Sequence, residues 1–301
     1  GGMTIVSASR RTDIPNYFGD WFFNRLEAGF ACVQNPMNPR QVRRVSLALE
    51  DVDGIVFWTK NPAGMLGRLD RLADFAYYFQ FTLTGYGRDV EPFLPDKKEA
   101  LIPAFRELAR QAGADRVIWR YDPILVNARY TPEYHRKAFC AIADRTLGCT
   151  KKVVISFVDW YGRNKKALEG LGIRQEEGPS QARQGVAAEL YDLAGDLASE
   201  AKKRGLVIET CSEAADLSAL GIGRGCCVDK NLLERLGGRP IKAGKDRNQR
   251  EACGCAQSVD IGAYHTCPTG CRYCYANGSR ERVRKNMGNC DVKSAFLLER
   301  V

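Results

Sequence analysis

The chain has 301 residues, of which 45% are hydrophobic and 10% aromatic, so it can bury a sizeable core. Lysine and arginine outnumber aspartate and glutamate by 45 to 36, and the formal net charge of +9 is compatible with a polyanionic partner or with a solvated basic surface. No apolar run approaches the roughly 18 residues that a membrane-spanning helix needs, which excludes a membrane-embedded protein, so we expect a globular cytoplasmic one.

Short runs of β-branched and aromatic residues alternate with stretches of helical character. The runs predict strands at residues 4–9, 54–60, 77–84, 116–122, 152–159, 206–211 and 259–264. Helices are expected at residues 16–28, 62–73, 97–112, 131–145 and 182–204. Repeated strand–helix units build parallel sheets, and seven near-regular repeats favour a closed or nearly closed barrel over an open sheet. The predicted fold class is therefore α/β, with a partial or closed parallel (β/α) barrel of the TIM type.

Three regions divide the chain in this interpretation. Residues 3–213 supply the barrel units. Residues 214–258 break the rhythm with glycine-rich, basic and cysteine-containing stretches, which predict an insertion. Residues 259–301 contain the final strand, a cysteine loop and a tail that begins with a short basic helix.

Polar residues follow most of the predicted strands. Barrels of this kind have their chemistry at the carboxyl ends of the strands, where side chains from different strands meet. Any one of these residues could form a salt bridge at the barrel mouth, but together they indicate a site. The candidates are Ser9, Arg10, Arg11, Asp13, Lys60, Arg120, Asp122, Asp159 and Glu213.

Twelve cysteines in a cytoplasmic chain indicate metal ligands or catalytic groups more than disulfides, because that compartment keeps thiols reduced. Cys267, Cys271 and Cys274 have C-x3-C-x2-C spacing in the loop after the last predicted strand. Thiolates are the usual ligands of a 4Fe-4S cluster, and three of them leave one iron open. Structural zinc is the alternative, but it usually takes four protein ligands.

A second group of cysteines precedes the motif. We expect Cys211, Cys227, Cys253 and Cys255 to close around an auxiliary 4Fe-4S cluster that has no open iron. A structural zinc ion is the alternative for this second site.

The cysteine motif, with Tyr273 just before its last cysteine, resembles the signature of radical S-adenosylmethionine (radical SAM) enzymes. Its wording, CPTGCRYCYA, is similar to the corresponding loop of spore photoproduct lyases. The wider pattern of SASRRTDIP, WTKNP, RYDP and the late motif is similar to an uncharacterised family, domain of unknown function 1848 (DUF1848). In the superfamily the motif follows the first strand, whereas here it follows the last. We therefore expect a circular permutation in which the last strand lies beside the strand that begins at Thr4.

The resemblance implies that the three motif cysteines bind a 4Fe-4S cluster whose open iron chelates S-adenosylmethionine. One-electron reduction by an external donor of the flavodoxin or ferredoxin type then yields a 5'-deoxyadenosyl radical, which abstracts a hydrogen atom from the substrate. Tyr273 and the Ser9–Asp13 strand end would contact the cofactor, with Asp13 on its amine and Arg10 or Arg11 on its carboxylate. The alternative is that Asp13 caps a helix beside two surface arginines. The remaining strand-end residues would hold cofactor ribose and substrate, namely Lys60, Arg120, Asp122, Asp159 and Glu213.

Two further hypotheses follow from the same features. The net charge and the lyase-like loop raise nucleic acid as the substrate, although the sequence has no obvious strand surface that combines aromatic and basic residues. A non-catalytic iron-sulfur electron-transfer or structural metal-binding protein is the other class, and such a protein would have no affinity for S-adenosylmethionine.

Overall fold

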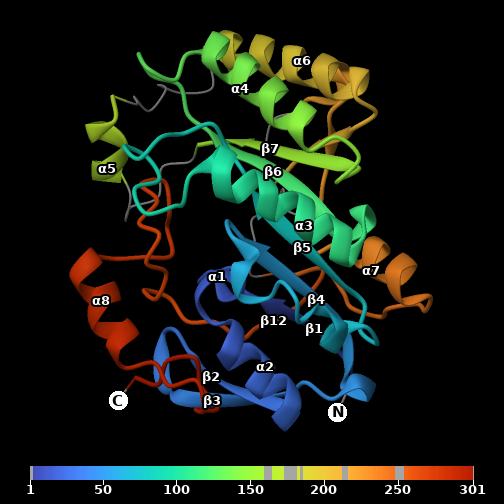
Figure 1. The fold of residues 1–301 in the computed structure, drawn as a ribbon, viewed down its shortest axis with the longest axis vertical. Coiled ribbons are helices and arrows are strands. Elements are labelled where there is room, and N and C mark those ends of the chain that lie inside the picture. Colours follow the sequence, from blue (N-terminus) through green and yellow to red (C-terminus); the bar gives the residue numbers. More distant parts are fainter. Residues whose placement is uncertain are drawn as a thin grey trace.

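The computed structural model describes residues 3–158, 165–172, 182–183, 186–211, 216–247 and 254–300. Within these residues an eight-stranded sheet runs through the molecule (Figure 1). Every strand pairing in it is parallel. In sheet order the strands are β11 (Gly223–Arg224), β10 (Val207–Thr210), β7 (Lys152–Phe157), β6 (Val117–Ile124), β5 (Tyr77–Thr82), β4 (Val52–Thr59), β1 (Thr4–Ala8) and β12 (Val259–Asp260).

All seven predicted strands are present, which confirms the α/β class. The predicted neighbour of the first strand is also confirmed, because Val6 lies opposite Val259 and Ser7 opposite Asp260 in the β1–β12 pair. The two-residue strand β11, which the sequence did not predict, forms the other edge. No pairing within the described ranges joins β11 to β12, so closure of the barrel stays a prediction.

Helices and turns connect these strands. The α-helices are α1 (Ile14–Tyr17), α2 (Gly19–Ala28), α3 (Ile102–Ala112), α4 (Pro132–Arg145), α5 (Lys165–Gly170), α6 (Ala188–Lys203), α7 (Lys230–Gly237) and α8 (Arg280–Gly288). Shorter helical turns are η1 (Leu49–Asp51), η2 (Pro62–Gly64), η3 (Leu69–Leu72), the π-helical η4 (Lys97–Leu101), η5 (Ala114–Arg116) and η7 (Ser218–Leu220). Two antiparallel strand pairs lie outside the main sheet, β2 (Phe30–Asn35) with β3 (Asn38–Ser46) and β8 (Ala182–Arg183) with β9 (Val186–Ala187).

The prediction of a helix at residues 62–73 is wrong, because the chain there forms only the short turns η2 and η3. Gly67 adopts a φ of 84°, in the left-handed region that interrupts a right-handed helix. A side chain at Gly64 would approach the carbonyl oxygen of Pro15 to 2.5 Å, so this turn packs directly on α1. The segment therefore follows the surface of its neighbour instead of forming a continuous helix.

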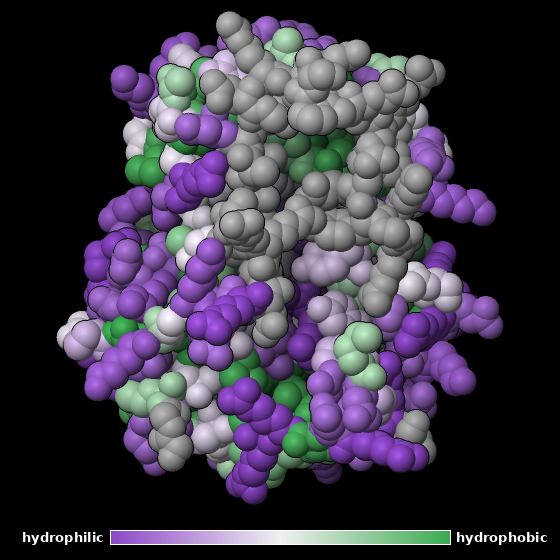
Figure 2. All heavy atoms as spheres, turned by 180° about the vertical axis from the view of Figure 1, so that it is seen from behind, coloured by the Kyte–Doolittle hydropathy of each residue, from purple (hydrophilic) through white to green (hydrophobic). Residues whose placement is uncertain are grey.

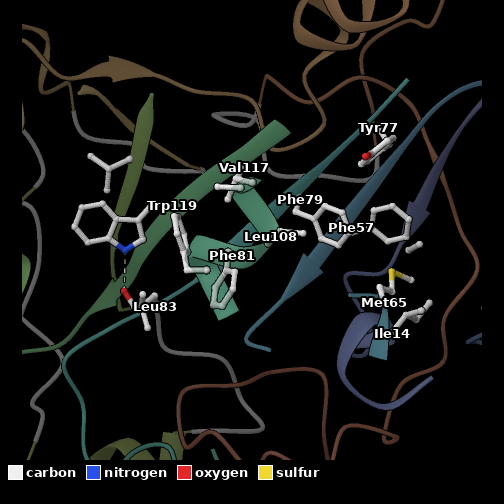
Figure 3. Close-up of a cluster of buried hydrophobic side chains, with 14 of the residues drawn as sticks. Ile14, Phe57, Met65, Tyr77, Phe79, Phe81, Leu83, Leu108, Val117 and Trp119 are labelled. Carbon is white, nitrogen blue, oxygen red and sulfur yellow. Dashed lines mark hydrogen bonds between the residues drawn. The ribbon is translucent and has the colours of Figure 1, made fainter. Parts of the chain in front are cut away.

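The sheet is buried on both faces, as parallel sheets usually are. Alternate residues of the strands, such as Phe57, Phe79 and Trp119, point to the face that α2, α3, α4 and α6 cover (Figures 1 and 3). The indole nitrogen of Trp119 donates a hydrogen bond of 2.9 Å to the carbonyl oxygen of Leu83, so this large side chain is buried with its polar atom satisfied (Figure 3).

The second face is covered by part of the predicted insertion. Tyr78 of β5 and Val56 of β4 pack with Leu232 and Leu233 of α7 and with the buried Cys255. A side chain at Gly54 would meet Leu233 at 2.7 Å, so this glycine lets α7 approach the sheet closely. The described residues of the insertion thus form a hydrophobic core against this second face of the sheet.

The β2–β3 hairpin was not predicted, although Asn35-Pro36 is a recognisable turn signal between two extended runs. The C-terminal tail returns to it. Cys32 donates its backbone N–H to the carbonyl oxygen of Ala295, and the side chain of Gln34 bonds both backbone groups of Arg300. These bonds fix the tail against the first quarter of the chain.

Figure 2 shows that hydrophilic side chains cover most of the described part of one broad face, with hydrophobic residues in smaller groups between them. Among the helices that the structure describes, none is long and apolar enough to cross a membrane.

Candidate functional site

A cavity of about 280 Å³ lies at the carboxyl ends of the central strands. This is the edge where the predicted site residues were expected to meet, and the structure brings most of them together there. The predicted residues that line it are Ser9, Arg10, Arg11, Asp13, Lys60, Arg120, Asp122, Cys211, Cys227, Cys267, Tyr273 and Cys274. Cys271 and Cys255 are buried beside it, whereas Asp159, Glu213 and Cys253 lie outside the described residues.

The cysteine loop begins a few residues after β12, so the parallel sheet sets its position. Its ends are closed by Asn277, whose side chain donates to the carbonyl oxygen of Cys267 at 2.7 Å. The hydroxyl groups of Tyr17 and Thr269 are 2.7 Å apart, and Arg272 donates its backbone N–H to Val90. The loop is therefore held at both ends and on two sides by neighbouring elements.

Lys60 is half-buried just after β4 and lines the cavity together with Cys267 and Cys274. The negative charge of Cys271, Cys274 and Cys267 in their ionised form outweighs the effect of burial on Lys60 and raises the pKa of its ammonium group. Burial raises the pKa of the Cys267 thiol to about 11, and the nearby ammonium opposes that shift. A fixed positive charge next to three thiolates would offset part of the charge that the ligands of a metal cluster carry.

Tyr273 is anchored by a buried carboxylate that the sequence did not reveal. Glu91 is 3% exposed, and it accepts hydrogen bonds from the Tyr273 hydroxyl, from Thr84 at 2.8 Å and from the ammonium group of Lys97. A single glutamate in the long loop after β5 carries no pattern that marks it as buried. Its role depends on partners up to 182 positions away.

Asp13 is buried and accepts three hydrogen bonds, from the Thr59 hydroxyl at 2.7 Å, the Lys60 backbone at 2.9 Å and the Asn16 backbone at 3.1 Å. Burial raises its pKa to about 6, although these bonds favour the charged form. Asp13 therefore caps α1, as the alternative interpretation expected, and its carboxylate also lines the cavity.

Asp260, at the end of β12, organises the end of β1. Its carboxylate accepts hydrogen bonds from Ser7 at 2.7 Å, Ser9 at 2.6 Å and the backbone of Arg10 at 2.8 Å. Arg11 lies 3.9 Å from the same carboxylate. The sequence did not single out Asp260, because its importance follows from the pairing of the last strand with the first.

Arg120 and Asp122 form a two-pronged ion pair on β6, with nitrogen–oxygen distances of 3.1 and 2.8 Å. The third guanidinium nitrogen donates to Gln80 at 2.9 Å and to the sulfur of Cys227 at 3.1 Å. Ser156 donates to Asp122 at 3.1 Å. This network fixes a paired positive and negative group in the cavity wall.

The second cysteine group was predicted to supply four free thiols as metal ligands, and the structure arranges two of them differently. The structure joins Cys211 and Cys227 in a disulfide, with their Cα atoms 6.6 Å apart. Cys255 is fully buried, and its sulfur accepts a hydrogen bond of 3.2 Å from Arg10. Cys211 and Cys227 fit a metal site only as a reduced pair. Within the described ranges, no three histidine, cysteine or acidic side chains are placed to hold one metal ion.

A family model described as "Domain of unknown function (DUF1848)" matches residues 5–276 of the chain. The search of curated proteins found no match to the chain.

Proposed function

The chain belongs to the DUF1848 family, and from the site of this member we propose that it is a radical SAM enzyme. One observation carries the proposal. A C-x3-C-x2-C loop begins a few residues after the edge strand of a parallel sheet, and two of its cysteines line a cavity at the strand ends. Fold position alone would be weak support, so the proposal depends on the combination of thiols, buried charge and cavity.

In this proposal Cys267, Cys271 and Cys274 hold a 4Fe-4S cluster with one open iron. The donor set suits such a cluster, because it consists only of thiols, and the half-buried side chain of Lys60 lines the same cavity. When bound, the cluster and S-adenosylmethionine supply the radical chemistry that removes a hydrogen atom from a substrate. The described residues of the chain orient the loop: Glu91 fixes Tyr273, and Asn277 closes the loop end.

The end of β1 is the proposed site for the methionyl group of S-adenosylmethionine. The Asp13 carboxylate accepts three hydrogen bonds, and a carboxylate has about four acceptor positions, so one position remains for an amine. Arg10 and Arg11 line the same cavity, where a guanidinium group would hold the carboxylate. Ser9 keeps this end in place through Asp260.

The groups proposed to hold ribose and substrate are Lys60 and the Arg120–Asp122 pair, together with Asp159 and Glu213. An ion pair presents an acceptor and a donor at a fixed separation, which suits hydroxyl groups. Trp58, Phe157 and Val158 add apolar surface to this part of the cavity wall.

We also propose that the sheet is a partial barrel, circularly permuted relative to other radical SAM enzymes. The parallel pairing of β12 with β1 supports this. It places the cysteine loop beside the first strand of the chain, where the loop would also lie if its own strand came before β1 in the sequence.

The auxiliary 4Fe-4S cluster at Cys211, Cys227, Cys253 and Cys255 stays a proposal for the reduced protein. Cys227 and Cys255 support it, because both are buried in the same cluster of residues beneath the cavity. Total iron and zinc per chain separates the proposed auxiliary cluster from a zinc site.

The test is anaerobic reconstitution with iron and sulfide, followed by reduction with dithionite in the presence of S-adenosylmethionine. We expect 5'-deoxyadenosine to form. The same reaction with a reduced flavodoxin or ferredoxin examines the proposed electron donor. A reconstituted protein that binds iron but forms no 5'-deoxyadenosine with either reductant would support the non-catalytic alternative.

A further inference from the structure

A groove of about 940 Å³ adjoins the cavity on the outer side of β12. The β2–β3 hairpin, the loop after β12, α8 and the C-terminal tail form its walls. Arg11 and Tyr275 line both the groove and the cavity. The two spaces therefore meet at these side chains, and a ligand long enough to fill the groove would reach the cysteine loop.

The groove is positively charged. Arg11, Arg282 and Arg300 reach it from three segments that are far apart in the sequence, and none of the described residues lining it is aspartate or glutamate. Arg11 also lies 3.9 Å from the Asp260 carboxylate, so Arg282 and Arg300 contribute most of the positive charge. A ligand that carries several negative charges would therefore find cations along the groove.

Two tyrosine rings, those of Tyr264 and Tyr275, line the groove together with these cations. The guanidinium carbon of Arg11 lies 5.2 Å from the ring centre of Tyr264. Tyr275 is 37% exposed and stands where the groove meets the cavity. The sequence did not show this combination, because its members lie between positions 11 and 300 and meet only in the folded chain.

The walls are fixed before any ligand arrives. Trp21 donates its indole N–H to the carbonyl oxygens of Ser294 and Phe296, and Gln34 holds the backbone of Arg300. The guanidinium group of Arg300 donates to Pro36 at 3.1 Å. A preformed groove loses little conformational freedom on binding, which favours affinity.

The size of the cavity also points to the groove. At about 280 Å³ it lies at the lower limit for small-molecule sites, so the proposed S-adenosylmethionine would leave little space within it. The greater part of a substrate would then lie in the groove, with one unit entering past Tyr275. This step rests on the proposed function.

We propose that the groove binds a single-stranded nucleic acid and presents one nucleotide to the cavity. Phosphates would lie along Arg282 and Arg300, and a base would stack on Tyr275. A basic groove with exposed aromatic rings is how proteins hold single strands, whereas a duplex keeps its bases stacked and offers none to a ring.

The experiment measures fluorescence anisotropy of labelled DNA and RNA single strands of about 12 nucleotides, titrated with reconstituted full-length protein between about 50 and 200 mM salt. We expect saturable binding that weakens with salt. Arg282→Gln should reduce the slope of log affinity against log salt by about 0.7, the value of one phosphate contact to a single strand. Arg284→Gln is the matched control, because Arg284 is exposed on the same helix but does not line the groove.

Tyr275→Ala should weaken binding about tenfold or more, and Tyr275→Phe should restore it, because stacking needs the ring and not the hydroxyl. Iron content of both variants confirms that the adjacent cysteine loop is still loaded. Comparing the affinities for the DNA strand, the RNA strand and a duplex of the same sequence shows which kind of nucleic acid the groove prefers.

Three results would overturn the proposal: no binding at the lowest salt, equal losses for the two arginine variants, or a preference for the duplex. Arg282-dependent binding of an acidic protein in place of the oligonucleotide would also overturn it. Formation of 5'-deoxyadenosine is measured in the same preparations. Strand binding without this product counts against the enzyme proposal alone, and product without strand binding counts against the groove alone.

Discussion

At the scale of single residues, the site depends on charged groups that are buried with a partner. The half-buried Lys60 lines the cavity with Cys267 and Cys274, and the buried Glu91 accepts hydrogen bonds from both Tyr273 and Lys97. The sequence predicted Lys60 from its place after a strand, but Glu91 and Asp260 were missed. Their partners are distant in the sequence, so neither residue stands in a motif.

Replacing Glu91 with glutamine should lower the free energy of unfolding by about 1–3 kcal/mol. The amide keeps the shape of the side chain but removes the negative charge that faces Lys97, whose ammonium group keeps its hydrogen bond to Thr84 but loses its ion pair. Urea unfolding of the two proteins measures the difference. Glu99→Gln is the control, since the Glu99 side chain is exposed, and it should change stability by less than about 0.5 kcal/mol. Equal stability of both variants would show that the buried pair contributes little.

Cys271→Ala should abolish 5'-deoxyadenosine formation and leave the protein folded. It removes one of three proposed ligands, and the loop lies outside the main core. Cys290→Ala is the control, because the sulfur of Cys290 bonds the carbonyl oxygen of Asn286 within its own helical end. Product formation is followed by chromatography and folding by circular dichroism. Activity retained by Cys271→Ala would remove this cysteine from the proposed ligand set.

At the scale of elements, the sequence predicted strands better than helices. Seven strands follow from apolar runs, because a parallel sheet buries both faces and leaves an unmistakable composition. The turns at residues 62–73 have helical composition, and only the left-handed Gly67 and the close approach of Gly64 to α1 prevent a helix. Short elements such as β11 were missed, since two residues carry no periodic pattern.

The junction of α4 with β6 should be sensitive to pH. His135 is fully buried between the Tyr121 hydroxyl and the carbonyl oxygen of Leu125, each 2.7 Å away. The carbonyl can only accept, so Nε2 carries the proton and Nδ1 accepts from Tyr121. Burial lowers the pKa of His135 below its ordinary 6.5.

The unfolded chain therefore binds a proton at His135 more readily than the folded one. Stability should be fully present above pH 6.5 and should fall as the pH drops towards the lowered folded value. Urea unfolding between about pH 5 and 8 measures the free energy of unfolding at each pH. In His135→Gln this free energy should change less with pH than in the unaltered protein. A parallel pH dependence in both would assign the effect to other groups.

At the scale of the whole molecule, the predicted insertion at residues 214–258 contributes to both the cavity and the core, because its Cys227 lines the cavity. Cys255 lies in the core that this segment forms against the sheet. If that segment also carries the auxiliary cluster, its metal and its packing are coupled, because site assembly contributes to folding.

A fully reconstituted chain should then contain about eight irons, four for each 4Fe-4S cluster. Cys255→Ala should retain about half of them or lose solubility. Iron analysis and analytical gel filtration measure the two outcomes. Full iron content with unchanged stability and turnover would show that Cys255 only fills space in the core, and one or two zinc ions per chain would favour the zinc alternative.

The pairing of β12 with β1 has a consequence for biosynthesis. The ribosome releases β1 early, and β4 can pair with it soon afterwards, yet its second neighbour, β12, is available only after residue 260 has emerged. Until then the Ser9 and Arg10 end lacks the Asp260 carboxylate that organises it, and the cavity lacks one wall. The three proposed cluster ligands, Cys267, Cys271 and Cys274, also follow β12 in the chain. The proposed cluster could therefore assemble only after Asp260 is available to organise the end of β1.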